Sequence, residues 1–333
     1  MVTTADTTGN PVRASDARTT MAPVVGVIYN PRSHRNQGRD LDIAARANVH
    51  IAQPQQREEI DAALHEFRAR GIQFLIINGG DGTVRDVLTA GMEVFGDDWP
   101  TLAVLPKGKT NALNVDLGAP PGWSLSDAID AWDNGRRMTR RPLLVEPLHG
   151  GGPRQAGFIM GAGGYALGVR VGQTAHALGA FDSLAVMASA GFGVLQSVFG
   201  SDRNPWRRGV AMDVRLNAAR EPMDHTGAGY EGRRSILMAS TLERFPGGIK
   251  LFGTLREGLK LAVLDRPSRR VLAMMPLILA GMRLKDPDAR GLHYRTADAF
   301  ELTIGDEYIL DGEAFPAGSY RISQGPALRF VVP

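Results

Sequence analysis

The residues best suited to chemistry are three glycines around one carboxylate, in the run Asn78-Gly79-Gly80-Asp81-Gly82-Thr83. The run follows an apolar segment, residues 74–77, that predicts a short buried strand, and it precedes apolar residues at helical spacing from Val84 onward. Glycines in a strand-to-helix turn allow positive φ and a close approach of backbone amides to a ligand. The N-terminus of the following helix favours an anion. The turn therefore predicts a phosphate-binding loop in which Asp81 could hold a cation or orient a hydroxyl.

Three more short motifs supply polar groups elsewhere in the chain. Asn30-Pro31 follows an apolar strand-like run at 24–29, and Pro106-Lys107-Gly108-Lys109-Thr110-Asn111 follows another at 102–105. Asp311-Gly312-Glu313 lies near the C-terminus, where on its own it would be interpreted as a plain β-turn.

Residues 23–142 alternate strand and helix signals. Strands are predicted at 24–29, 49–52, 74–78 and 102–106, and helices at 56–70, from Thr83 onward and at 124–134. This alternation predicts an α/β domain, a doubly wound parallel sheet with helices on both faces. Ligands of such sheets bind beyond the carboxyl ends of the strands, where all three N-terminal motifs lie. We therefore expect a nucleotide-binding domain over 23–142.

From residue 143 the pattern changes to short alternating segments broken by glycine and proline. It predicts an all-β second domain over 143–333, a β-sandwich that includes a strand at 328–332 and binds the acceptor. Two helical insertions are expected, near 172–200 and 267–283. Residues 1–22 are Thr-rich and polar and lack the apolar core of a secretory signal, so they predict a disordered tail.

The four motifs, in this order, resemble the signatures of the diacylglycerol kinase catalytic-domain family, which includes sphingosine kinases and bacterial lipid kinases and is related to NAD kinases. That family has Gly-Gly-Asp-Gly-Thr, an Asn-Pro phosphate loop, Pro-x-Gly-Thr-x-Asn and a C-terminal Asp-Gly-Glu at the corresponding places. The resemblance runs from about residue 24 to the end of the chain. It implies a nucleotide on the first domain, an acceptor on the second, and chemistry in the cleft between them.

The resemblance also implies a reaction, the transfer of the γ-phosphate of ATP, with Mg²⁺, to a lipid hydroxyl. Asp81 would orient the nucleotide or hold Mg²⁺ through water. Asp311 would accept the proton of the acceptor hydroxyl, and Glu313 would support it or act as the base itself. The predicted nucleotide contacts are Asn30, Pro31, Asn78, Gly79, Gly80, Asp81, Gly82, Thr83, Gly108, Lys109, Thr110 and Asn111.

The chain departs from the family pattern at several positions. Lys109 stands where the family has Thr, and Ala112 stands where an Asp often follows the family Asn. The family element Asp-Gly-x-Leu-Asp, which helps to place an accessory Mg²⁺, is matched only by Glu257-Gly258-Leu259-Lys260-Leu261. Glu257 could still bind that metal, whereas Leu261 could not. Two alternatives follow: a catalytically weakened nucleotide- or lipid-binding protein, and an NAD kinase-like enzyme that phosphorylates a soluble acceptor.

Two other glycine-rich matches are interpreted as coincidences. Gly108-Lys109-Thr110 looks like the end of a P-loop, but Ala103 stands where a P-loop needs glycine. Residues 161–166 fit the dinucleotide form Gly-x-Gly-x-x-Ala, but they lie in the β-rich half without a βαβ context. There we predict a glycine-rich β-turn or bulge.

Composition narrows the class of protein. The 333 residues include no cysteine, which excludes disulfides, thiolate catalysis and cysteine-ligated zinc. A net charge of +3 does not indicate a nucleic-acid partner, but it suits an anionic membrane surface. No run reaches the ~20 apolar residues of a spanning helix, so we expect no transmembrane segment. We expect a cytoplasmic enzyme, peripheral on the inner face of the membrane.

Two apolar insertions, 181–199 and 267–285, indicate an apolar cleft that binds the acceptor. Arg269 and Arg270 precede the second apolar run, and Arg283 and Lys285 follow it, which fits a helix dipping into a membrane interface or a core helix. Diacylglycerol suits such a cleft, with a sphingoid base, an isoprenoid alcohol or a glycolipid as alternatives. A glycine-rich sheet edge near 158–164 could pair two subunits into a homodimer.

Overall fold

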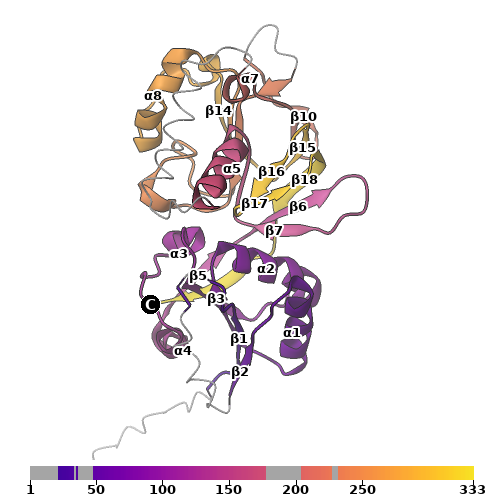
Figure 1. Ribbon diagram of the computed structural model, residues 1–333, viewed down its shortest axis with the longest axis vertical. Coiled ribbons are helices and arrows are strands. Elements are labelled where there is room, and N and C mark those ends of the chain that lie inside the picture. The colour runs from indigo at the N-terminus through magenta and orange to yellow at the C-terminus, as the bar shows by residue number, and fades with distance from the viewer. Residues whose placement is uncertain (1–21, 34, 37–47, 178–203, 227–231) are drawn as a thin grey trace, which may run out of the picture.

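The computed structural model describes residues 22–33, 35–36, 48–177, 204–226 and 232–333. The predicted tail, apart from residue 22, and the apolar segment 181–199 lie outside these ranges. Figure 1 shows an α/β part at the bottom and a β-rich part at the top, and the C-terminal strand returns to the bottom part. The chain therefore crosses between the two parts twice.

The lower part is built on one sheet with the strand order β2-β1-β3-β4-β19-β5. Its first five strands run parallel, and β5 pairs antiparallel with β19. The strands are β1 (Val25–Tyr29), β2 (Val49–Ala52), β3 (Phe74–Gly79), β4 (Thr101–Pro106), β5 (Arg136–Arg140) and β19 (Leu328–Val332). This confirms the predicted parallel α/β domain.

Helices cover both faces of this sheet because successive strand residues point to opposite sides. Ile28 and Ile77 face the cluster that includes α1 (Arg57–Ala69) and α2 (Asp81–Phe95). Val27 and Ile76 face α4 (Leu125–Asn134) instead. The start of α4 is the predicted capping box, in which Ser124 and Asp127 cap each other's backbone amides.

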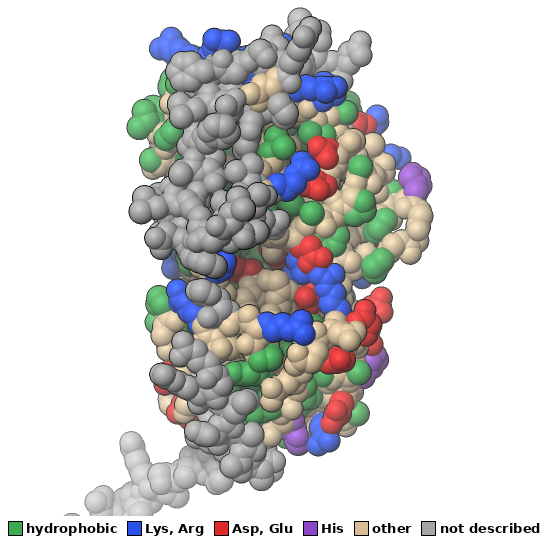
Figure 2. All heavy atoms as spheres, viewed as in Figure 1, with side chains coloured by type: hydrophobic (Ala, Val, Ile, Leu, Met, Phe, Trp, Pro, Cys, Tyr) green, Lys and Arg blue, Asp and Glu red, His purple; other side chains and the backbone are tan. Residues whose placement is uncertain are grey.

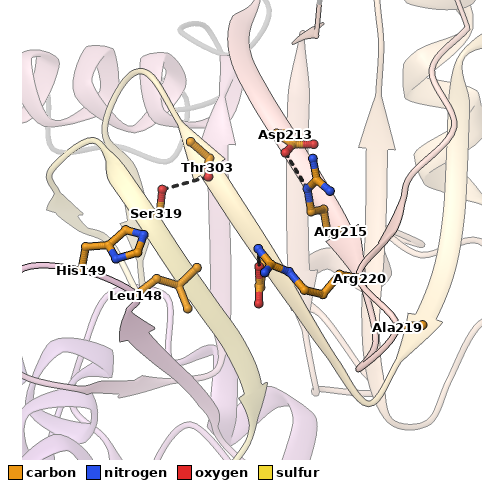
Figure 3. Close-up of a pocket in the computed structure, with 9 residues that line it drawn as sticks. Leu148, His149, Asp213, Arg215, Ala219, Arg220, Thr303 and Ser319 are labelled. Atoms are coloured by element: carbon orange, nitrogen blue, oxygen red, sulfur yellow. Dashed lines mark hydrogen bonds and ion pairs between the residues drawn. The ribbon is translucent and has the colours of Figure 1, made fainter.

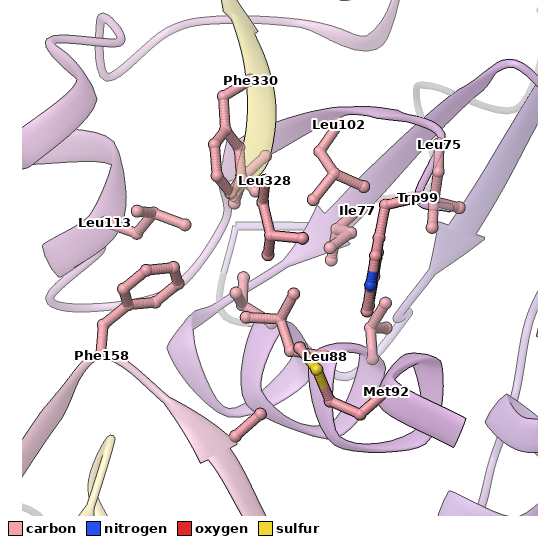
Figure 4. Close-up of a cluster of buried hydrophobic side chains, with 14 of the residues drawn as sticks. Leu75, Ile77, Leu88, Met92, Trp99, Leu102, Leu113, Phe158, Leu328 and Phe330 are labelled. Atoms are coloured by element: carbon pink, nitrogen blue, oxygen red, sulfur yellow. The ribbon is translucent and has the colours of Figure 1, made fainter. Parts of the chain in front are cut away.

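Strand β19 corrects the placement of residues 328–332. They were expected in the second domain, but they pair with β4 and β5 and complete the first sheet. Leu328 and Phe330 are fully buried beside Leu102, as Figure 4 shows. Sequence periodicity identified the strand but not its partner, because pairing between residues so far apart leaves no local signal.

The upper part consists of two antiparallel sheets that enclose a second apolar core. One sheet has the order β10-β9-β15-β18-β6-β7, with β11 also pairing with β9, and the other has the order β14-β13-β12-β8-β16-β17. The first contains β6 (Leu143–Pro147), β7 (Gln155–Gly157), β9 (Val210–Leu216), β10 (Glu221–Pro222), β11 (Arg233–Arg234), β15 (Ala299–Ile304) and β18 (Gly318–Gln324). The second contains β8 (Ile159–Gly163), β12 (Ile236–Ser240), β13 (Leu259–Leu264), β14 (Leu292–Ala297), β16 (Tyr308–Leu310) and β17 (Glu313–Phe315).

Short helices complete the described part of the chain. They are α3 (Ala112–Leu117), α5 (Gly164–Ala177), α7 (Pro205–Arg208) and α8 (Arg269–Ala280), with 3₁₀ turns at Pro246–Gly248 and Asp288–Arg290. The insertion predicted at 267–283 is α8. Of the insertion predicted at 172–200, only the part up to Ala177 is described, as the end of α5.

Two predictions about residues 158–166 were wrong. Residues 161–166 form neither the predicted β-turn nor the predicted bulge, because β8 pairs with β12 in unbroken register up to Gly163 and then leads into α5. Gly163 has a φ of +67°, which suits glycine. A dinucleotide-binding turn is also excluded here, because such a turn belongs to a parallel βαβ unit and β8 pairs antiparallel with β12 and β16. The same pairing places β8 inside its sheet, so it offers no free edge for a homodimer.

The two parts share one apolar core. Leu113 of α3 and Phe158, which lies between β7 and β8, belong to the same buried cluster as the face of the first sheet that α2 covers (Figure 4). A shared core of this kind resists relative motion of the two parts. It fixes the position of the second part over the carboxyl ends of the parallel strands.

Candidate active site

The predicted glycine turn joins β3 to α2. Gly80 is the N-cap of α2, which begins at Asp81, two residues before the predicted start. A Cβ on Gly80 would lie 2.8 Å from the Cα of Gly108, and a Cβ on Gly108 would lie 2.7 Å from the Cα of Gly80. The loops that follow β3 and β4 therefore touch through their backbones, which only glycine permits at these two positions.

The Asn-Pro loop after β1 is bonded to the same turn. Asn30 donates from Nδ2 to Thr83 Oγ1 at 2.8 Å, and its backbone amide donates to the Asn78 carbonyl at 3.0 Å. Asn36 adds bonds from Nδ2 to the carbonyls of Asn30 and Asn78, at 2.6 and 3.2 Å. The side chains of Asn30 and Thr83 thus hold two of the predicted motifs together.

The third loop is shaped by Asn111. This residue has a left-handed φ of 50°, and its side chain accepts from the Gly108 amide at 2.7 Å and donates to the Gly108 carbonyl at 2.8 Å. Lys109 and Thr110, which lie between Gly108 and Asn111, are exposed. The structure therefore brings the three N-terminal motifs to one edge of the sheet, as predicted, with Lys109 at a loop tip.

Asp81 lies where the turn meets the loop after β4. Its Oδ1 accepts from the amide of Ala112, the first residue of α3, at 2.9 Å. Burial raises the pKa of this carboxyl, although the backbone amides around it oppose the change. Asp81 consequently holds α3 in place and keeps a carboxylate at the edge of the glycine turn.

Asp311 and Gly312 form the two-residue turn of the β16–β17 hairpin. Both have positive φ, 45° and 86°, as a type I′ turn requires. The Asp311 carboxylate turns back and accepts from the amides of Phe158 and Ile159, each at 2.9 Å. The motif therefore forms a β-turn and at the same time directs the Asp311 carboxylate toward β8, so the two interpretations of the motif are compatible.

Burial raises the pKa of Asp311 to about 7. The amides of Ile159 and Phe158 and the charge of Arg85 oppose the increase, whereas the charge of Asp81 adds to it. The two carboxylates come from different parts of the molecule and are close enough to repel each other. A carboxyl with such a pKa suits proton transfer at neutral pH.

Glu313 has a different environment from Asp311. Its Oε2 forms ion pairs with Arg57 of α1 and with Arg85 of α2, and the Arg85 side chain is only 4% exposed. Burial opposes ionisation, but the two guanidinium groups hold the pKa of Glu313 below its usual range. Glu313 therefore bonds the hairpin to the first part of the molecule, and its carboxylate is a weak base.

Sequence reasoning missed Tyr165, Arg57 and Arg85. Burial, together with the charges of Asp311 and Asp81, raises the pKa of Tyr165 to about 12. Its ring covers Gly161, where a Cβ would lie 2.2 Å from Tyr165 Cδ1. The four-residue spacing of this glycine and this tyrosine was the available signal. The arginines left none, because their partner Glu313 is distant in the sequence.

The accessory Mg²⁺ implied by the family resemblance does not fit the residues present. Glu257 is exposed, and within the described ranges no three His, Asp or Glu side chains form a group that could hold a metal. Lys260 is the fourth of the five residues of this element and is 1% exposed. We therefore assign Glu257 no metal.

Figure 3 shows a hollow on the outer face of the β9–β15–β18 sheet, remote from these carboxylates. Its volume is about 530 Å³. Asp213 pairs with Arg215 at 2.9 Å, and Arg220 pairs with Glu301 at 2.7 Å, so the charges within it are neutralised locally. This hollow lacks the convergent groups of the site around Asp81 and Asp311.

Comparison with known proteins connects this site to a family. Residues 24–142 match the model of the diacylglycerol kinase catalytic domain. A stretch of 72 residues is 33% identical to the probable lipid kinase YegS of Shigella flexneri and to that of Escherichia coli O1:K1, covering 22% of this chain and 24% of theirs. The match thus spans about a quarter of the length of these curated relatives.

Solved structures resemble the chain over nearly its full length. Two crystal structures from Bacillus anthracis str. Sterne that carry the name diacylglycerol kinase are both 16% identical to it. One has a TM-score of 0.64 and covers 95% of this chain and 99% of its own; the other has a TM-score of 0.61 and covers 93% and 97%. Identities this low establish the shared fold alone.

Proposed function

We propose that this chain, whose residues 24–142 match the model of the diacylglycerol kinase catalytic domain, belongs to that family and transfers the γ-phosphate of ATP to a lipid hydroxyl. One observation carries the proposal. The hairpin that bears Asp311 is bonded to the helix that begins at Asp81, because Glu313 of the hairpin forms an ion pair with Arg85 of α2. The turn that bears Asp81 has the geometry of an anion site at the N-terminus of a 15-residue helix.

Each residue then has a role in the transfer. Backbone amides of the glycine turn hold the nucleotide phosphates, Asp81 orients the nucleotide with its Mg²⁺, and Lys109 meets a phosphate as an exposed point charge. Asp311 accepts the proton of the attacking hydroxyl, since its pKa of about 7 lets it exchange a proton near neutrality. Glu313, held by Arg57 and Arg85, positions the hairpin. Positioning and charge neutralisation supply most of the catalysis.

A lipid acceptor is supported by a hollow with aromatic lining in the second part of the molecule. A hollow of about 420 Å³ opens between the β6–β7 hairpin and β16–β18, and Tyr308, Phe315 and Tyr320 are among its lining residues. Tyr308 lies three residues before Asp311 and stacks on Phe315 with ring centroids 5.2 Å apart. Such a wall suits an acyl chain, and a lipid with one free hydroxyl, such as diacylglycerol, is the acceptor class we propose.

Docking on a membrane is supported by α8. The helix buries Val271 and Ile278, whereas Ala273, Pro276, Leu277 and Ala280 face outward without a charge among them. Leu277 is 58% exposed, and Ile249 is 37% exposed beside it, since the Lys250 amide donates to the Leu279 carbonyl at the end of the helix. Figure 2 shows apolar side chains at this outer edge of the upper part.

Basic residues flank this apolar face: Arg269, Arg270, Lys250, Arg283 and Lys285. Arginine and lysine around an apolar helical face suit an anionic lipid surface. No helix in the part of the chain that the structure describes is long and apolar enough to cross a bilayer. We therefore propose peripheral binding through α8 at the cytoplasmic face, with the interdomain site presented to lipid hydroxyls.

The transfer proposal is tested with ATP labelled in its γ-phosphate, incubated with diacylglycerol, sphingosine and a polyprenol in mixed micelles and, separately, with NAD. We expect label in one lipid class, and its loss in Asp81→Asn and Asp311→Asn. Label in NAD alone would move the chain to the related soluble-substrate activity. Bound ATP without transfer to any acceptor would support the binding-protein alternative.

The docking proposal is tested by co-sedimentation with vesicles, with or without anionic lipid. The parent protein should bind anionic vesicles, and binding should fall in Leu277→Ser and with added salt. Val115→Ser is the matched control, since Val115 is 38% exposed but lies on α3. Equal binding of the Leu277 and Val115 variants would contradict a role for α8.

A further inference from the structure

Lys260 is a buried cation at the junction of the two parts of the molecule. Its neighbours in β13, Leu259 and Leu261, point into the sandwich core, and Lys260 points to the opposite face. There its Nζ donates to the carbonyls of Arg256 and Gly258, at 2.9 and 3.1 Å, and lies 5.9 Å from the centroid of the Phe252 ring. The ammonium thus closes the loop over residues 252–258.

The surroundings of Lys260 include a buried carboxylate. Asp116 of α3 is fully buried and accepts from the amides of Glu243 and Arg244, at 2.7 and 2.8 Å, and from Arg140 Nε at 2.6 Å. These bonds join α3 to the segment after β12. Burial lowers the pKa of Lys260 to about 8, while Asp116 and Glu243 oppose the decrease, so the ammonium predominates at neutral pH.

These contacts resemble those of a bound cation. Backbone carbonyls and carboxylates are the usual ligands of Mg²⁺ and Ca²⁺. Here the carbonyls of Arg256 and Gly258 are occupied by the ammonium protons, and Leu261 replaces the second acid of the family element. We infer that the Lys260 ammonium is a built-in cation that holds the 252–258 loop at the domain junction in place of an accessory Mg²⁺.

The inference is independent of the proposed reaction, so it is tested without ATP or lipid. Thermal unfolding is measured after chelation and again with millimolar Mg²⁺. The parent should give the same Tm in both conditions. Lys260→Met should lose several degrees of Tm, and Mg²⁺ should not restore them, whereas Lys285→Met, an exposed lysine, should match the parent.

A second variant, Lys260→Asp, places a carboxylate beside the carbonyls of Arg256 and Gly258 in place of the ammonium. We expect its Tm, and the binding of Mn²⁺ measured by paramagnetic relaxation, to become dependent on the metal. A parent Tm that rises with Mg²⁺ would overturn the inference, as would a Lys260→Met protein as stable as the parent. If the parent protein transfers no phosphate but its Tm does not depend on Mg²⁺, the proposed function is contradicted and this inference still holds.

Discussion

At the scale of single residues, the contrast between Asp311 and Glu313 defines the chemistry. Both belong to one three-residue motif, yet Asp311 is buried, whereas Glu313 pairs with two arginines. Burial, with a smaller contribution from the charge of Asp81, raises the pKa of Asp311, and the two guanidinium groups hold the pKa of Glu313 below its usual range. In the proposed function, the motif therefore combines a proton acceptor with an anchor.

This contrast predicts the pH dependence of transfer. A general base must be ionised, so kcat/KM should fall as pH decreases through about 7, where Asp311 becomes protonated. In Asp311→Asn this fall of kcat/KM at low pH should disappear, and the rate of transfer should decrease roughly 10²–10⁴-fold. A parent profile that is flat from pH 6 to about 8 would contradict the assignment of Asp311 as the base.

The contact between two glycines gives a steric prediction. Gly80→Ala adds a Cβ 2.8 Å from the Gly108 Cα, and pushing the two loops apart should cost roughly 1–3 kcal/mol and weaken ATP binding. Gly82→Ala is the matched control, because its Cβ would meet nothing closer than Arg85 Nη2 at 4.0 Å. Denaturation and ATP titration of both variants would check this. Equal stability of the two would refute the backbone contact.

At the scale of elements, local sequence patterns predicted those features that are formed by residues close together in the chain. The Ser124–Asp127 capping box, the alternation of strands and helices, and the glycine turn all depend on residues within a few positions of one another. The motif order also pointed to the family whose model matches residues 24–142. The ion pairs of Glu313 and the partner of β19 depend on pairings that no short window contains.

Strand β19 predicts that the α/β part of the molecule does not fold from residues 23–142 alone. Without residues 328–332, the buried edges of β4 and β5 lose their partner, and the cluster around Phe330 opens. We expect a 23–142 fragment to lack a cooperative thermal transition in circular dichroism, and a version with 326–333 attached by a flexible linker to regain one. A cooperative transition in the shorter fragment would contradict this.

At the scale of the whole molecule, several independent contacts hold the catalytic groups in register. The shared apolar core, the bonds of Asp116 and the pairs of Glu313 with Arg57 and Arg85 each join the two parts. Glu313→Gln should therefore lower stability by roughly 1–3 kcal/mol, less than a fully buried pair would cost, because Arg57 is half exposed. Chemical denaturation would measure the loss, and unchanged stability would contradict the anchoring role.

We propose that Asp311, not Glu313, accepts the proton in phosphate transfer. The decisive measurement is the rate of γ-phosphate transfer to the best lipid acceptor in Asp311→Asn and Glu313→Gln, each shown to be folded and to bind ATP. We predict that the transfer rate decreases roughly 10²–10⁴-fold in Asp311→Asn and much less in Glu313→Gln. The Glu313→Gln variant should keep the decrease of kcat/KM below about pH 7. An Asp311→Asn protein that transfers phosphate at the parent rate would contradict the claim.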